Sequence, residues 1–122
     1  FMEAVVSGCA LVAAADGEIS SAEKLKMSGF IKSSNELKVF DMNKVIATFN
    51  NACEKFEFDE QIGRAEALAV VGKIRGKPEQ ARLLVRVCIA IGASDGNFDD
   101  QEKGVCRLLC AELGLTPSDF DL

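Results

Sequence analysis

The sequence has no histidine, no tryptophan and no tyrosine, and it has only two prolines among 122 residues. Without histidine, neither a Ser-His nor a Cys-His pair can form, so nucleophilic catalysis of those kinds is excluded. General acid and base roles would fall to carboxylates, lysine or cysteine. We therefore expect no enzymatic activity.

Long apolar runs are also missing. No stretch approaches the roughly 20 residues that a membrane-spanning helix needs, and the beginning lacks the charged region and cleavage site of a secretory signal. The chain opens directly on an apolar helical pattern at Phe1, with no capping residue before it. We expect that a segment upstream is missing, and that the protein is cytoplasmic and has no transmembrane segment.

Positive charge is in the minority. The chain has 19 Asp and Glu against 14 Lys and Arg, which gives a formal net charge of -5. Because nucleic-acid binding depends on clustered cations, this balance argues against a nucleic-acid partner. The negative net charge favours cations or proteins with basic surfaces as partners.

The cysteines do not form a recognisable framework. They are odd in number and contain no Cys-x-x-Cys pair, which argues against both a disulfide scaffold and a zinc-finger spacing. Each stands within an apolar run, so we interpret them as core residues in a reducing compartment. The alternative is a set of thiols that react with or ligate a soft metal or metalloid, which requires an exposed, electropositive setting. The five are Cys9, Cys53, Cys88, Cys106 and Cys110.

The apolar residues repeat with the helical period of 3.6, and no alternating β pattern of any length occurs. With 48% hydrophobic residues the chain can build one core. We predict an all-α, single compact domain over residues 1–122, with about six or seven helices. The predicted inward stripes are Val5, Cys9, Val12 and Ala13; Leu25, Met27, Phe30 and Ile31; Val45, Ile46, Phe49, Ala52, Cys53 and Phe56; Ile62, Ala65, Leu68, Ala69 and Gly72; Leu84, Val87, Cys88 and Ile91; and Val105, Leu108, Leu109 and Leu113.

Capping residues mark the predicted boundaries. Asp41, Asp59 and Asp99 each precede an amphipathic segment and are predicted N-caps. Pro78 suits the first turn of a helix, where its missing N–H is not needed. Gly114 is predicted to end the helix before it.

One short segment occurs twice. Residues 15–24 recur as residues 94–103, with Asp, Gly, Glu and Lys at the same relative positions 79 residues apart. The same offset pairs Cys9 with Cys88, so the likeness extends into the flanking helices. The repeat predicts two helical hairpins packed about a pseudo-two-fold axis.

A purely structural explanation covers most of this repeat. The glycine of each Asp-Gly pair can end a helix, and residues 20–23 and 99–102 match the capping box of the helix that follows. Asp16 and Asp95 are left without a structural role. We refer to residues 16–24 and 95–103 as the first and second acidic joints.

Cation binding is the other explanation. In the second joint Asp95, Asn97 and Asp99 occupy positions 1, 3 and 5 of a tight turn, and Glu102 follows in the next helix. Calcium takes about six to eight such oxygens and magnesium six. The loop is not an EF-hand, because Gly at position 6 and Glu at position 12 are missing, so calcium, magnesium and manganese stay open. The candidate metal ligands are Asp16, Glu18 and Glu23 in the first joint and Asp95, Asn97, Asp99 and Glu102 in the second.

These segments resemble the TerB tellurite-resistance family. The resemblance rests on the two joints and on residues 33–41, 56–59 and 113–120, and it spans nearly the whole chain. It implies about seven helices and a role in bacterial resistance to tellurite and related stresses. It also implies a basic stretch before the domain, which this sequence lacks. At matching positions, the residues that it implies chelate a cation are Asp16, Glu23, Asp95 and Glu102.

Three functions follow as hypotheses. The first is a metal-sensing scaffold that joins other tellurite-resistance proteins in a membrane-associated complex, which would place the protein peripherally at the inner membrane. The second is a metal-independent interaction module in which the joints are only helix caps. The third is a cryptic metal-dependent hydrolase.

Overall fold

The computed structural model describes residues 1–14, 25, 28–29, 32–33, 38–93 and 99–122. In these ranges the chain forms five α-helices, one 3₁₀-helix and no strand, which confirms the all-α class. No helix in them is long and apolar enough to cross a membrane. The predicted total of six or seven helices depends partly on residues outside the described ranges. The elements are α1 (Met2–Ala13), α3 (Met42–Phe58), α4 (Glu60–Gly72), α5 (Pro78–Gly92), α6 (Asp100–Leu113) and the 3₁₀-helix η2 (Pro117–Phe120).

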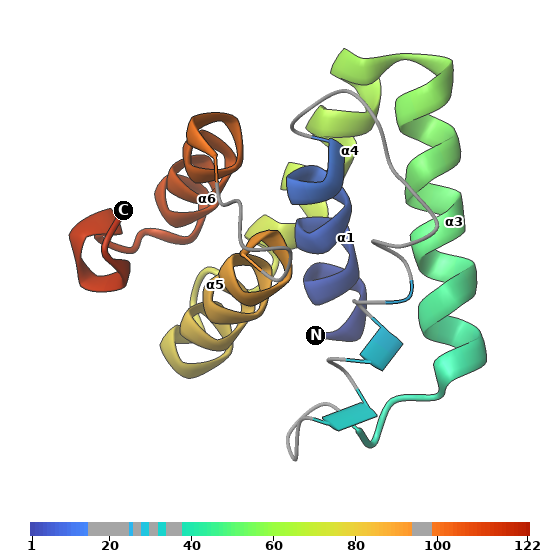
Figure 1. Cartoon of the computed structure of the whole chain (residues 1–122), viewed down its shortest axis with the longest axis horizontal. Coiled ribbons are helices and arrows are strands. Elements are labelled where there is room, and N and C mark those ends of the chain that lie inside the picture. Colours follow the sequence, from blue (N-terminus) through green and yellow to red (C-terminus); the bar gives the residue numbers. More distant parts are fainter. Residues whose placement is uncertain (15–24, 26–27, 30–31, 34–37, 94–98) are drawn as a thin grey trace.

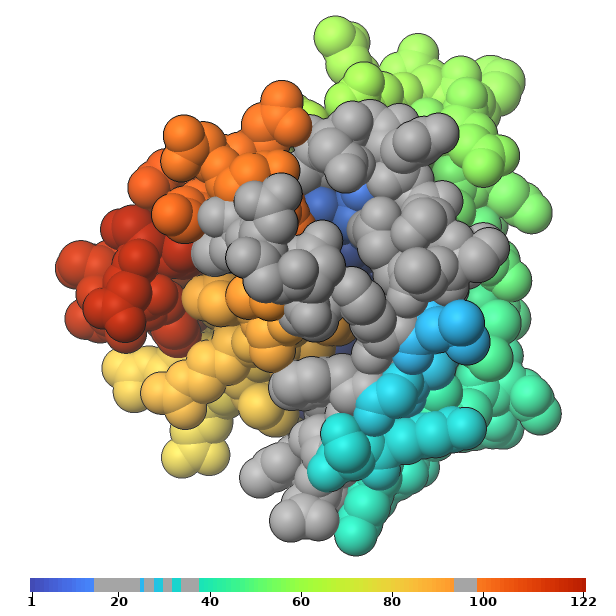
Figure 2. All heavy atoms as spheres, in the orientation of Figure 1, coloured from blue at the N-terminus to red at the C-terminus, as the bar shows by residue number. Residues whose placement is uncertain are grey.

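Helix α1 lies at the centre of the molecule. It has α3 on one side and α5 and α6 on the other (Figure 1), and α3, α4, α5 and α6 all pack against it. Every residue from Ala4 to Ala13 is buried, and only small areas of this helix are visible on the face shown in Figure 2. The residues of this helix that were predicted to face inward are buried, and the residues between them are buried as well. A helix buried all round is expected at the middle of a core.

The predicted helix boundaries are confirmed by their hydrogen bonds. The Asp41 carboxylate accepts from the Asn43 N–H at 2.9 Å, and the Asp59 carboxylate accepts from two N–H groups in the first turn of α4, at 2.9 and 3.1 Å. Pro78 stands in the first turn of α5. Gly114 ends α6 with φ of 72°, in the left-handed region where glycine avoids Cβ strain.

The predicted inward face of α4 is wrong. The buried residues are Gly63, Ala67 and Val71. A Cβ on Gly63 would lie 2.8 Å from the backbone nitrogen of Phe56, so glycine permits the close approach of α4 to the end of α3. The face of α4 that packs inward is therefore the one that carries Gly63, Ala67 and Val71. Of the predicted stripe, Ile62, Ala65 and Ala69 are exposed, whereas Leu68 and Gly72 are half-buried.

Three further residues predicted to face inward are exposed instead. They are Leu25, Ile46 and Leu108, of which Leu25 is 73% exposed. In α6 the buried residues are Cys106, Leu109, Cys110 and Leu113. Met27, Phe30 and Ile31, from the helix predicted after Ser20, lie outside the described residues.

All five cysteines are buried and reduced, which confirms the core interpretation. The thiols of Cys9 and Cys88 hydrogen-bond to each other, and this bond and burial raise the pKa of Cys88 well above its ordinary value. Burial, with smaller contributions from Cys110 and Glu102, raises the pKa of Cys106 to about 12. Since the thiolate is the reactive and metal-binding form, these thiols are poor nucleophiles and ligands at neutral pH.

Candidate metal centre

The second acidic joint leads into α6 through a complete capping box. Asp99 has an extended backbone, and its Oδ1 accepts from the Glu102 N–H at 2.8 Å. In return the Asp99 N–H donates to Glu102 Oε1 at 3.3 Å. The structural explanation of the repeat is therefore confirmed for these two residues.

The same turn concentrates negative charge. Asp99, Asp100 and Glu102 all lie at the N-terminal end of α6, where the helix dipole favours anions. A carboxylate has two oxygens, so a cap bond through Asp99 Oδ1 does not exclude a cation at the second oxygen. This end of α6 is therefore compatible with both explanations of the joint.

Helices α1 and α5 end in the same way. Ala14 and Ala93, which are 79 residues apart, end α1 and α5 with φ and ψ of -83° and -2° and of -87° and -4°. Their N–H groups also bond to equivalent carbonyls. These carbonyls belong to Ala10 and Val12 after α1, and to Ile89 and Ile91 after α5. The two sequence repeats therefore share the same backbone conformation at these helix ends, which lie two residues before Asp16 and Asp95.

The structure places two of the predicted ligands and brings them together, at the start of α6. Within the described ranges, no group of three or more Cys, Asp and Glu side chains is arranged to hold a metal ion. The sequence prediction of a larger ligand set therefore stays a prediction. Asp16, Glu18, Glu23, Asp95 and Asn97 lie outside the described residues.

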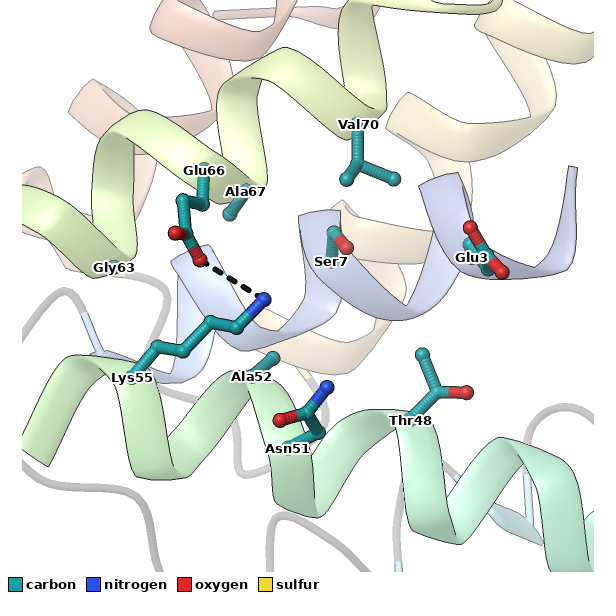
Figure 3. A pocket seen from close by; sticks show the side chains of 10 residues that line it. All are labelled: Glu3, Ser7, Thr48, Asn51, Ala52, Lys55, Gly63, Glu66, Ala67 and Val70. Carbon is teal, nitrogen blue, oxygen red and sulfur yellow. Dashed lines mark ion pairs between the residues drawn. The ribbon is translucent and has the colours of Figure 1, made fainter.

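Sequence reasoning missed a polar groove between α1, α3 and α4. It has a volume of about 210 Å³, and an ion pair between Lys55 Nζ and Glu66 Oε2, 2.9 Å apart, links two of its walls (Figure 3). Its sequence signal is the run of Thr48, Asn51 and Lys55 at helical spacing beside the apolar stripe of α3. We call this feature the α1/α3/α4 groove. Its polar lining residues are Glu3, Ser7, Thr48, Asn51, Lys55 and Glu66.

The fold and the joint together define a small all-helical protein with an acidic, capped helix junction. The model of the family described as "Tellurite resistance protein TerB" matches residues 2–122. A tellurium resistance protein TerB from an Alcaligenes species is 45% identical over 89 residues, which cover 73% of this chain and 73% of that protein. The chain belongs to the TerB family of tellurite-resistance proteins. No solved structure shows a significant match to it.

Proposed function

We propose that this TerB-family protein acts in tellurite resistance and stress response as a scaffold that binds a divalent cation through its two acidic joints. The observation that carries this function is the matched ending of α1 and α5. Both helices end in the same conformation, two residues before an Asp-Gly pair in the sequence. Helix capping by itself does not require a second, equivalent carboxylate-bearing joint.

The donor chemistry supports a hard cation. Asp99 and Glu102 supply carboxylate oxygens from one helical turn, and calcium, magnesium and manganese prefer such oxygens. A cation beside them would also offset the mutual repulsion of Asp99, Asp100 and Glu102. The proposed ligand set is completed by Asp95 and Asn97 in this joint, and by Asp16, Glu18 and Glu23 in the first joint.

We also infer that the two joints belong to hairpins related by a pseudo-two-fold axis. Cys9 and Cys88, which occupy equivalent positions, hydrogen-bond to each other. Contact between equivalent residues is expected next to such an axis.

A metal-independent interaction module is the second candidate, and the complete capping box favours it. In that case Asp99 and Glu102 act only on the stability of α6. A metal-dependent hydrolase is a third hypothesis, which would require measured turnover that the substitution Asp95→Ala removes.

Replacing a carboxylate with the corresponding neutral amide distinguishes cation binding from helix capping. Asn caps helices as well as Asp, and Gln can replace Glu in a capping box. Asp99→Asn and Glu102→Gln should therefore change the free energy of unfolding by less than about 0.5 kcal/mol. They should weaken calcium, magnesium or manganese binding, measured by isothermal titration calorimetry, by about tenfold or more. Asp100→Asn, in the same turn, is the matched charge control.

The substitution Asp95→Ala also distinguishes the cation-binding scaffold from the metal-independent module. If the joint binds a cation, Asp95→Ala abolishes the binding heat while the domain stays folded. If wild-type protein binds none of the three ions and Asp95→Ala melts the domain, the capping function is correct and the scaffold function is wrong.

We propose that the partners are other tellurite-resistance proteins in a complex at the inner membrane, with this chain on the cytoplasmic side. The net charge of -5 favours partners with basic surfaces. The expected result is co-sedimentation with inner-membrane vesicles that carry those proteins and none with vesicles that lack them. Equal co-sedimentation with both would contradict it.

A further inference from the structure

The α1/α3/α4 groove is bounded by two parallel rows of side chains. Thr48, Asn51 and Lys55 follow one face of α3, and Glu66 stands on the facing side of α4 (Figure 3). From Thr48 to Lys55 the groove extends along two helical turns, or about 10 Å. It is therefore elongated, with room for a short linear molecule.

The floor of the groove is small and polar. Ser7 is 6% exposed and is the single buried polar residue among those that the structure describes. It lies within the buried part of the central helix, residues 4–13, on the side that borders the groove (Figure 3). Gly63 and Ala67 also line the groove. A polar group at a buried position is stabilised only by hydrogen bonding, and a ligand in the groove can take part.

The charges are separated along the groove. Lys55 and Glu66 form the ion pair toward one end, whereas Glu3 lies toward the other end (Figure 3). One cationic and two anionic side chains leave this lining with one net negative charge. Adjacent opposite charges suit a zwitterionic head, and the separate carboxylate suits a second cationic group.

We propose that the α1/α3/α4 groove binds a free basic amino acid such as lysine. Its α-carboxylate pairs with Lys55, its α-ammonium with Glu66, and its side-chain cation with Glu3. The ion pair between Lys55 and Glu66 is half-exposed, and exposed pairs contribute little to stability, so a ligand can open it readily.

The size of the groove fits this class of ligand. The groove has a volume of about 210 Å³. Sites for drug-sized molecules usually measure about 300–1,000 Å³. The hydroxyl and amide groups of Ser7, Thr48 and Asn51 supply further hydrogen bonds along the ligand. This site is separate from the acidic joints and does not depend on the proposed cation.

The test is a titration of the whole chain followed by amide NMR shifts, with a chelator present to remove divalent cations. Three probes separate the parts of the ligand: lysine; norleucine, which lacks the side-chain ammonium; and cadaverine, which lacks the carboxylate. Lysine should give saturable shifts at the groove and bind about tenfold more tightly than either of the other two.

Substitutions in the groove test which side chain contacts which group of the ligand. Glu3→Gln should weaken lysine about tenfold and leave norleucine unchanged. Lys55→Met should weaken lysine and norleucine and leave cadaverine unchanged. Glu60→Gln is the charge control, since it removes a carboxylate from α4 outside the groove, where Glu60 pairs with Arg64 at 3.6 Å.

Three results would overturn the proposal. The first is the absence of saturable shifts with lysine. The second is equal binding of lysine and cadaverine, which would remove the role of the Lys55–Glu66 pair. The third is an equal loss of binding in Glu60→Gln, which would mean that overall charge, and not the groove, attracts the amino acid.

Discussion

Helix α1 has two different sides. Toward α5, a Cβ placed on Gly8 would lie 3.0 Å from the Cys88 Sγ and 3.2 Å from the Leu84 Cδ2, so the contact is dry and tight. Toward α3 and α4, Ser7 borders a polar groove of about 210 Å³. Both sides of α1 are buried, so the difference is between a tight apolar contact and a contact whose edge carries an open polar groove.

The largest change in stability is expected on the side of α1 that packs against α5, which we call the dry side. Leu84 is fully buried, so Leu84→Ala should lower the free energy of unfolding by about 2–5 kcal/mol, through lost burial and the cavity left behind. Urea unfolding followed by circular dichroism measures it. Leu108, which is 38% exposed, gives the control Leu108→Ala, with an expected loss below about 1 kcal/mol. Equal losses would contradict a stability centred on α1 and α5.

The dry side should also weaken at alkaline pH. Folding raises the pKa of Cys106 from 9.0 to about 12, so the folded state favours the protonated thiol. Its contribution is complete below pH 9 and is lost as pH rises from 9 toward 12, at about 1.4 kcal/mol per pH unit for each such thiol. Cys88 acts in the same direction. The chain has neither histidine nor tyrosine, so those groups do not contribute.

The measurement is the free energy of unfolding in urea at intervals from pH 7 to 10.5. Cys106→Ala should make the decline above pH 9 less steep, because one of the titrating thiols is gone. An unchanged slope in that variant would show that other groups cause the decline.

Glycine substitutions compare close packing with open space. Gly8→Ala should destabilise the domain by about 1 kcal/mol, because Cys88 and Leu84 must move, and this outweighs the better helix propensity of alanine. Gly104 has nothing within 4 Å of a Cβ placed on it, so Gly104→Ala should stabilise α6 by about 0.5–1 kcal/mol. Thermal melting measures both. Shifts of the same sign would contradict the tight contact at Gly8.

The smallest effect is expected in the groove. Lys55→Met breaks an ion pair whose partners are about half-exposed, so the free energy of unfolding should fall by no more than about 1 kcal/mol. The melting temperature with and without added salt measures the loss and its screening. A loss as large as that of Leu84→Ala would show that this half-exposed ion pair contributes as much stability as a buried core residue.

Local chemistry made the helix boundaries predictable. Asp41, Asp59, Asp99 and Gly114 act on backbone groups within a few residues of themselves, and all four cap or end helices as predicted. The same holds for part of the candidate metal site, because the capping box of Asp99 requires only its own turn. The full ligand set depends on how the joint is arranged in space, and for that reason it stays a prediction.

Helix packing was less predictable. The stripe of α4 was assigned to Ile62, Ala65, Leu68, Ala69 and Gly72, yet the buried residues are Gly63, Ala67 and Val71. The groove was missed for a related reason. Its walls belong to three helices, and no single segment shows that Ser7 lies beside Lys55 and Glu66.

The sequence by itself determined that the chain is helical, where its helices begin and end, that its cysteines are buried, and that an acidic joint occurs twice. These properties depend on periodicity, caps and composition, which act over short distances. Only the tertiary structure decided that α1 is buried all round, which face of α4 packs inward, and where a polar groove stays open. Such features depend on whether facing helices approach closely, and small residues such as Gly8 and Gly63 control that approach without a hydrophobic signal of their own.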